Sequence, residues 1–234
     1  MALMWCLAAA AQPFTLNDPA LLGGFSNAAA SPTPPAFVEY WTGSVGAGGT
    51  GFTNSSFSAS GGNYAVLVIA FRTGGSFTTT PTINAVPMTL LNSASYFTGS
   101  GSNMVYGLAN PSSGNVAVAF STAPSTGASA IIMLFSGVHN VGTVASYYPG
   151  ATAQTSVSQT LTSTGTSNLC FDSLAWSGTG TTVTNGASQT LVTTSIGNGS
   201  DTASSTIQGS SSGTTTLSWT CASQRVSWIG VALY

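Results

Sequence analysis

The stretch that most constrains the fold is Tyr64–Phe71, which reads Tyr-Ala-Val-Leu-Val-Ile-Ala-Phe. Eight consecutive apolar residues, rich in β-branched and aromatic types and soon followed by Gly74-Gly75, are too short for a membrane span. Their composition favours a strand over a helix. Because both faces of this strand are apolar, side chains must cover it from above and below, as a second layer or a closed barrel. We therefore expect an all-β core.

Other short apolar runs, bounded by Gly, Pro, Ser or Asn, recur along the chain at the 8- to 12-residue spacing typical of a sandwich or jelly roll. The expected strands are 37–42, 51–59, 80–85, 87–91, 103–108, 115–120, 128–135 and 226–234. Residues 214–221 alternate, so that Thr215, Leu217, Trp219 and Cys221 share one face. We expect 128–135 and 226–233 to pack with Tyr64–Phe71. No fixed-period repeat is visible in the sequence.

The predicted domain organisation is an apolar arm and Pro-rich linker at residues 1–35, followed by a β-sandwich domain at 36–234. Residues 1–11 are apolar and end in small side chains, like a secretory signal, but they lack a positively charged start. We prefer an extended arm that packs on its own domain or on a neighbouring subunit, and an uncleaved signal is the alternative. The proposed arm contacts are Met1, Leu3, Met4, Trp5, Leu7 and Phe14.

Charged residues are scarce. Asp, Glu, Lys and Arg supply 3% of the 234 residues, and the net charge is -2. Only two residues are Lys or Arg, so no basic patch can form for a nucleic-acid backbone or an anionic membrane. So small a net charge gives little repulsion between molecules in solution. We infer a protein whose surfaces are covered in an assembly.

Several sequence patterns lie where a core strand meets a turn. They are Thr73-Gly74-Gly75 after the buried strand, Thr-Ile-Asn-Ala-Val-Pro-Met-Thr-Leu-Leu at 82–91, Ile-Met-Leu-Phe-Ser-Gly-Val at 132–138, Thr-Thr-Thr-Leu-Ser-Trp at 214–219, and Trp-Ile-Gly-Val-Ala-Leu at 228–233. With these patterns, residues 36–234 resemble a group of Gly/Ser/Thr-rich, jelly-roll-like β-sandwich proteins. These occur as phage virion proteins and as modules of bacterial surface or secreted proteins. The chain departs from them in its uncharged loops and in having His139 where relatives often carry an acid.

No set of residues predicts catalysis. A Ser-His-Asp triad would need His139 with Asp172 or Asp201, but no G-x-S-x-G elbow is present. Zinc ligands are not clustered, and the loop 198–201, a weak calcium candidate, is first of all a turn. We therefore expect no enzyme activity, no cofactor and no metal. Cys170 and Cys221 are either free or joined by one bridge.

Aromatic residues support an alternative function, because exposed rings stack on sugars. The candidate glycan contacts are Trp41, Tyr147, Tyr148 and Trp176. A sandwich of this size also needs aromatic residues in its core, so inward-facing rings are the competing interpretation.

The resemblance, together with the missing catalytic sets and the apolar N-terminal segment, implies a non-enzymatic virion structural protein, either a capsid decoration and stabilisation protein or a fibre head. It would act through homo-oligomeric assembly, with a trimer as the first guess, and through arm docking. Capsid or tail proteins are the expected partners, with a host-surface glycan as a further candidate. The alternatives are a secreted or cell-surface carbohydrate-binding module and an extracellular filament subunit.

Overall fold

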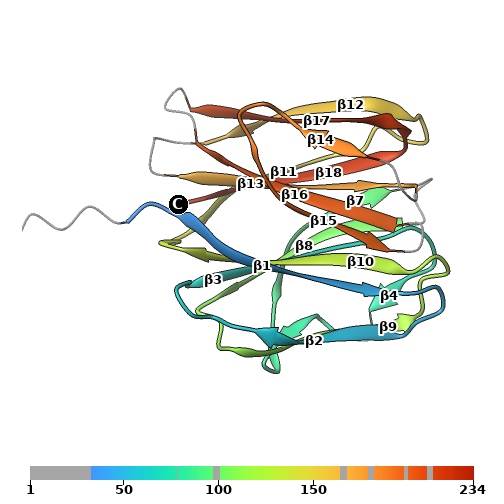
Figure 1. The fold of residues 1–234 in the computed structure, drawn as a ribbon, viewed down its shortest axis with the longest axis horizontal. Coiled ribbons are helices and arrows are strands. Elements are labelled where there is room, and N and C mark those ends of the chain that lie inside the picture. The colour runs from blue at the N-terminus through green and yellow to red at the C-terminus, as the bar shows by residue number, and fades with distance from the viewer. Residues whose placement is uncertain are drawn as a thin grey trace, which may run out of the picture. The chain divides into compact units, whose positions relative to one another are not determined.

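A computed structural model describes residues 33–77, 79–96, 101–163, 168–178, 182–197, 200–209 and 213–234. The predicted arm contacts from Met1 to Phe14 lie outside this described part. Thr33–Tyr234 forms one unit of the chain, and its strands make antiparallel sheets stacked as sandwiches (Figure 1). The all-β, antiparallel sandwich predicted from the sequence is confirmed.

The first half of the unit holds an outer and a central sheet. Its strands are β1 (Ala36–Val45), β2 (Gly51–Phe57), β3 (Tyr64–Phe71), β4 (Ser76–Phe77), β5 (Thr82–Ile83), β6 (Val86–Pro87), β7 (Thr89–Tyr96), β8 (Gly101–Ala109), β9 (Gly114–Thr122) and β10 (Ala128–Ser136). The central sheet has the order β1-β10-β3-β8-β7. The outer sheet has the order β2-β9-β5-β6, and β4 pairs with β9.

The second half repeats this arrangement. Its strands are β11 (Val141–Tyr147), β12 (Gln154–Thr162), β13 (Leu169–Trp176), β14 (Val183–Asn185), β15 (Thr190–Gly197), β16 (Ser200–Gln208), β17 (Thr214–Gln224) and β18 (Val226–Leu233). The central sheet has the order β11-β18-β13-β16-β15, and the outer sheet has the order β12-β17-β14. Strand by strand, this is the order of the first half, with β1 equivalent to β11, β3 to β13 and β10 to β18.

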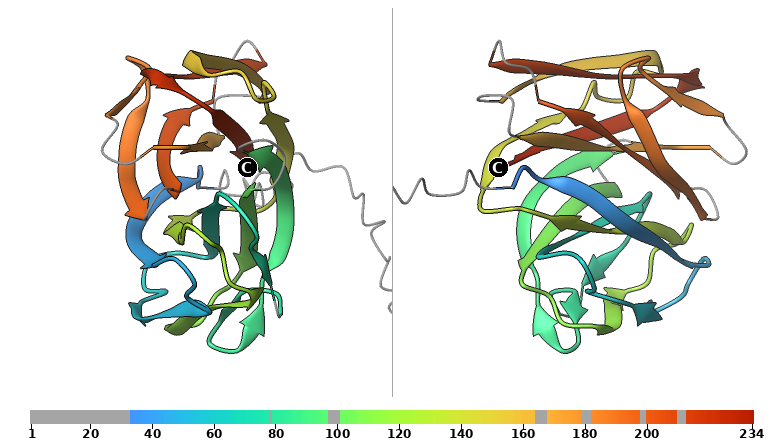
Figure 2. Two further views of the ribbon diagram at one scale, coloured as in Figure 1. Left: turned by 90° about the vertical axis from the view of Figure 1, so that its right-hand side faces the viewer. Right: turned by 60° about the vertical axis from the view of Figure 1, so that its left-hand side comes forward.

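The two halves meet through their central sheets with approximate two-fold symmetry. Strand β1 contacts β15, and its equivalent β11 contacts β7, the equivalent of β15. In the same way, β10 contacts β15 and β16, while β18 contacts β7 and β8. Reciprocal contacts of this kind define an isologous interface, the type found in two-fold dimers. Residues 33–234 therefore resemble two copies of one sandwich that are stacked through their central sheets (Figure 2).

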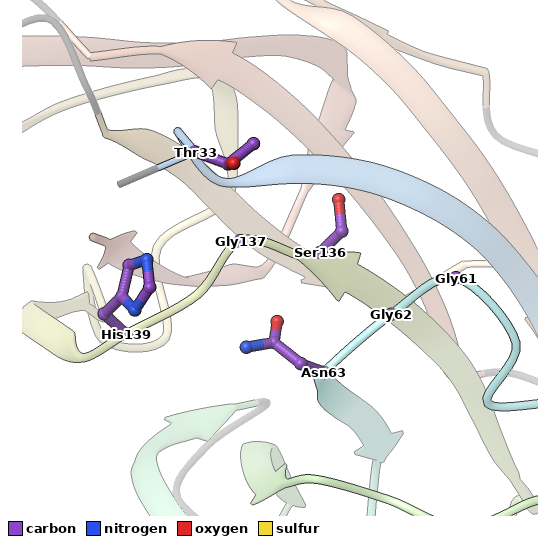
Figure 3. Close-up of a pocket in the computed structure, with 7 residues that line it drawn as sticks. All are labelled: Thr33, Gly61, Gly62, Asn63, Ser136, Gly137 and His139. Carbon is purple, nitrogen blue, oxygen red and sulfur yellow. The ribbon is translucent and has the colours of Figure 1, made fainter. Parts of the chain in front are cut away.

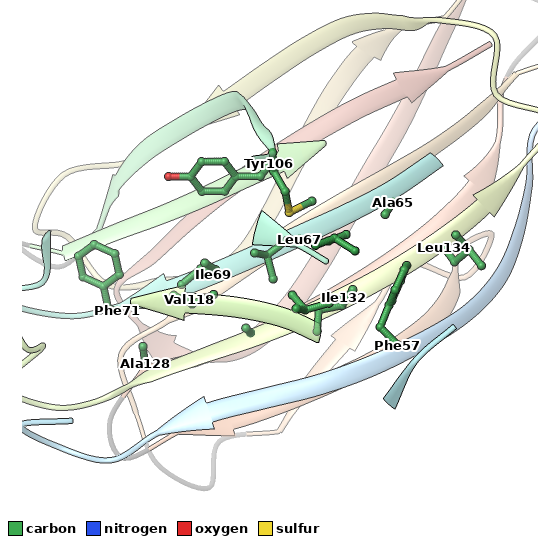
Figure 4. Packing of buried hydrophobic residues seen from close by; sticks show 14 of the residues in the cluster. Phe57, Ala65, Leu67, Ile69, Phe71, Tyr106, Val118, Ala128, Ile132 and Leu134 are labelled. Carbon is green, nitrogen blue, oxygen red and sulfur yellow. The ribbon is translucent and has the colours of Figure 1, made fainter. Parts of the chain in front are cut away.

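Among the described residues, three apolar clusters fill the spaces between the sheets. The first lies between the outer and central sheets of the first half and includes Leu67, Tyr106 and Ile132 (Figure 4). The second joins the two central sheets, where the rings of Phe135 and Phe171 stack with centroids 5.5 Å apart. The third lies between the sheets of the second half. Each central sheet is thus covered on both faces.

This layering explains why Tyr64–Phe71, the strand β3, is apolar at every position. All eight residues of β3 are buried, as predicted. Strand β10 pairs with β3 along its length. Strand β18 belongs instead to the other central sheet and meets β3 through the second cluster, where Val66 and Ile229 are members. The alternation at 214–220 is also confirmed, with Thr215, Leu217 and Trp219 buried.

Candidate functional site

The aromatic residues predicted to contact glycans occupy different environments. Trp41 is partly buried on β1, and its ring lies 4.8 Å from that of Phe57. Tyr147 and Tyr148 are partly exposed at and just after the end of β11. Trp176 is only 1% exposed and belongs to the third core cluster, because β13 is covered on both faces. This corrects its assignment as an exposed stacking platform.

His139 lies in the exposed loop that joins the two halves. It lines a pocket of about 500 Å³ whose other walls are Thr33, Gly61, Gly62, Asn63, Ser136 and Gly137 (Figure 3). Asn63 holds the loop in place, since its Nδ2 donates to the Val138 carbonyl at 2.6 Å and its Oδ1 accepts from the Val138 amide at 3.0 Å. The pocket is lined by three glycines, by the side chains of Thr33, Asn63 and Ser136, and by one imidazole.

The acids considered for a triad with His139 lie in the core of the second half. Asp172 is at the middle of β13 and Asp201 is on β16, and both are fully buried. His139 is on the surface loop, so the structure does not bring a Ser-His-Asp triad together. Nothing in the local sequence around Asp172 or Asp201 indicates that these acids lie on core strands.

Asp172 is the centre of a buried polar network that sequence reasoning missed. Its Oδ1 accepts from the Ser205 amide at 3.1 Å and from the Ser205 hydroxyl at 2.7 Å. Its Oδ2 accepts from the indole Nε1 atoms of Trp219 at 2.7 Å and Trp228 at 2.9 Å. These donors come from β16, β17 and β18, so one carboxylate links the central sheet to the outer sheet.

Gln189 extends the network from Ser205 toward the outer sheet. Its Nε2 donates to the Ser205 hydroxyl oxygen at 2.6 Å, and its Oε1 accepts from the backbone amide of Ser218 at 2.6 Å. The Ser218 hydroxyl lies 3.5 Å from the same Oε1. The Gln189 side chain is therefore held at both ends of its amide in a buried site.

The first half shows what this region looks like without a polar network. The strand register places Asp172 opposite Ser205, and in the first half it places Leu67 opposite Tyr106. Gln189 and Met88 each come directly before the equivalent strands β15 and β7. All three first-half residues are buried in the first core cluster. Apolar packing is thus sufficient to build this fold, and the polar set is an addition specific to the second half.

Burial dominates the electrostatics of Asp172. Loss of solvation raises the pKa of its carboxyl group to about 6, while the hydrogen bonds from Ser205, Trp228 and Trp219 act in the opposite direction. The neighbouring Cys170 thiol is a member of the third core cluster, and burial raises its pKa to about 11. Cys170 and Cys221 are both free.

This shift predicts how stability depends on pH. Between the ordinary Asp pKa of 3.8 and the folded value of about 6, the native state binds the proton more tightly than the unfolded chain. The contribution of Asp172 to the free energy of unfolding therefore falls by roughly 2 to 3 kcal/mol as pH rises from about 4 to about 6, and is level above that. Urea titrations at a series of pH values check this. The free energy of unfolding of an Asp172→Asn variant should not show this decrease. If it decreases between about pH 4 and about pH 6 as much in the variant as in the wild type, the prediction is wrong.

Exposed apolar side chains gather on two neighbouring edge strands. Val38 and Tyr40 lie on β1, and Leu191 and Ile196 lie on β15, with exposed fractions from 38% to 59%. Among the strands that the structure describes, each of these two pairs on one side only, β1 with β10 and β15 with β16. The Ser195 hydroxyl on β15 donates to the Gly43 carbonyl on β1 at 3.2 Å, which fixes the two edges beside each other. We call these two strands the β1/β15 edge.

Comparison with protein-family models, curated proteins and solved structures finds no match to this chain. Of the resemblance noted from the sequence, the structure supports the all-β fold with antiparallel sheets. Within the described residues, no group of three or more His, Cys, Asp and Glu side chains is placed to hold a metal ion. No helix in the described part of the chain is long and apolar enough to cross a membrane.

Proposed function

We propose that this protein is a non-enzymatic structural subunit that works as a homo-oligomer, as a virion decoration protein or fibre head. The observation that carries the proposal is the β1/β15 edge. Strand edges with unpaired backbone groups are templates for association, and native proteins protect them with charged side chains, prolines, bulges, short strands or a covering segment. Here Glu39 is the one charged residue on the two strands, among four exposed apolar side chains.

A second copy of the chain is the partner that this edge fits. Apolar side chains with few charges are typical of the centre of a subunit interface. Backbone pairing between β1 or β15 of neighbouring subunits would bury the open hydrogen-bonding groups together with Tyr40 and Ile196. Residues 1–32 lead directly into this half of the domain, and we propose that they supply further contacts between subunits as an assembly arm.

Lysine substitutions at the edge test the assembly. We expect the double variant Tyr40→Lys/Ile196→Lys to raise the subunit dissociation constant at least tenfold, because two charges must be buried or the interface must open. Light scattering coupled to size-exclusion chromatography measures the change. The matched control is Val86→Lys/Leu90→Lys, which places the same charges on exposed apolar positions of β6 and β7.

Three outcomes separate the parts of this proposal. A wild-type chain that stays monomeric at high micromolar concentration would refute self-assembly. Equal loss of assembly in the edge variant and the control would refute the choice of surface. Deletion of residues 1–32 should weaken assembly as well, and unchanged assembly would remove the arm from the mechanism. Mass spectrometry of purified virus particles would test the virion location.

A further inference from the structure

Three buried side chains of the second half form an arrangement suited to covalent chemistry. Ser205 donates its hydroxyl proton toward Asp172 Oδ1 at 2.7 Å, and the same hydroxyl oxygen accepts from Gln189 Nε2 at 2.6 Å. Ser205 and Asp172 are fully buried, and Gln189 is 8% exposed. The Ser205 hydroxyl therefore lies between a carboxylate base and a carboxamide, and all three groups are buried.

Each group matches a role in acyl transfer. A serine hydroxyl becomes a nucleophile when an adjacent base accepts its proton, and Asp172 is placed as that base. The carboxamide carbon of Gln189, Cδ, is the electrophile. It is bonded to Nε2, the atom that donates a hydrogen bond to the Ser205 hydroxyl oxygen. Its carbonyl oxygen accepts from the Ser218 backbone amide at 2.6 Å, with the Ser218 hydroxyl at 3.5 Å. Such donors stabilise the negative charge that develops on this oxygen during attack.

We propose that Ser205 and Gln189 join in an intramolecular ester, with release of ammonia. The Ser205 Oγ attacks the Gln189 Cδ, so that an Oγ–Cδ bond forms and the Cδ–Nε2 bond breaks. The hydroxyl proton passes to Asp172 and then to the leaving nitrogen, which departs as ammonia. No electrons are gained or lost overall, and no further reactant is needed.

The surroundings favour both formation and survival of the bond. Holding two groups in contact replaces a bimolecular encounter with a unimolecular step, which greatly raises the effective concentration. The attack requires a rotation of the Gln189 amide that turns its face toward Ser205. The carboxyl pKa of about 6 leaves Asp172 able to accept a proton and return it near neutral pH. Exclusion of water protects the ester from hydrolysis.

The internal comparison between the halves supports treating these residues as one unit. The equivalent positions of the first half hold Leu67, Tyr106 and Met88, all of them packed in an apolar core. The first-half set has no carboxylate, carboxamide or serine hydroxyl, the second-half set has all three, and the order of strands in the central sheets is the same. The bond would close a loop between residues 16 apart and fix the start of β15 to β16. This inference does not depend on the proposed assembly.

Intact-mass measurement of the full chain tests the proposal. After folding and incubation at neutral pH, we expect the denatured wild-type chain to be about 17 Da lighter than its sequence mass, the loss of one ammonia. Proteolysis should yield a linked peptide pair that contains Gln189 and Ser205. Hydroxylamine should separate that pair, because it cleaves esters.

Variants assign the loss of mass to this site. Ser205→Ala and Gln189→Met, the latter copying Met88 of the first half, should both keep their full mass, so that failure of one to fold leaves the other as a test. Ser204→Ala is the control, since its buried hydroxyl is next in the chain and should not affect the bond. A wild-type chain that keeps its full mass after prolonged incubation would overturn the proposal. Loss of ammonia that persists in Ser205→Ala, or that maps to other peptides, would do the same.

Discussion

Replacement of Asp172 by Asn is expected to lower the free energy of unfolding by about 3 kcal/mol at pH 7. The carboxylate accepts four hydrogen bonds, from the amide and hydroxyl of Ser205 and from the indoles of Trp219 and Trp228. An Asn side chain has a similar shape but presents an NH₂ group to one of these donor pairs. At least one buried donor then lacks an acceptor, which costs about 1–3 kcal/mol for each group left unpaired. Urea denaturation followed by far-UV circular dichroism measures the loss.

Two comparisons isolate the hydrogen bonds from other effects. Trp219→Phe and Trp228→Phe each remove one donor and retain an aromatic ring, so each should cost about 1–2 kcal/mol, less than Asp172→Asn. The Ser205→Ala variant cannot form the proposed ester. In this background the loss of free energy of unfolding caused by Asp172→Asn is measured without any contribution from a cross-link. If Asp172→Asn is as stable as the wild type in both backgrounds, the network does not hold the two layers together.

Replacement of Phe171 by Ala is expected to lower the free energy of unfolding by about 3–5 kcal/mol and to affect both halves of the domain. Phe171 is fully buried between the central sheets, where it stacks on Phe135 with an interplanar angle of 28°. Truncation removes a large buried ring and leaves a cavity that the surrounding sheets can fill only in part. Because the cavity lies at the interface between the halves, it weakens the contact that makes them one cooperative unit.

Two spectroscopic probes test this cooperativity. Trp176, Trp219 and Trp228 belong to the second half and Trp41 to the first, so tryptophan fluorescence follows mainly the unfolding of the second half. Far-UV circular dichroism follows the strands of both halves. We expect the two transitions to coincide in the wild-type chain and in Phe171→Ala. Phe171→Leu, which removes less volume, should cost less than Phe171→Ala. Separate transitions in the wild type would show that the halves unfold independently.

The burial of individual residues was predictable where the local sequence pattern is strong. Tyr64–Phe71 had to be covered on both faces because every residue in it is apolar, and the structure buries all eight. The alternation of Thr with Leu217 and Trp219 identified the inner face of β17, because side chains of a strand point to opposite sides in turn. Trp176 could not be placed in this way, since an aromatic residue near a turn fits either a core or a surface.

The duplication and the polar network could not be predicted from local patterns. The equivalent strands β3 and β13 differ at most positions, because a buried strand needs volume and shape rather than particular residues. Asp172, Gln189 and Ser205 are separated in the sequence, and an Asp within a run of mixed residues gives no sign of its burial. Only the pairing of β13 with β16, and the packing of β17 over them, brings the three together.

The sequence by itself determined an all-β chain of stacked layers with very little charge, because hydrophobic pattern and composition act locally along each strand. The tertiary structure decided which strands are neighbours, that the two halves are equivalent sandwiches related by an approximate two-fold axis, and where the buried carboxylate lies. These features depend on contacts between residues far apart in the chain. Many sequences satisfy the same local pattern, and the long-range packing of the layers selects among the arrangements that the pattern allows.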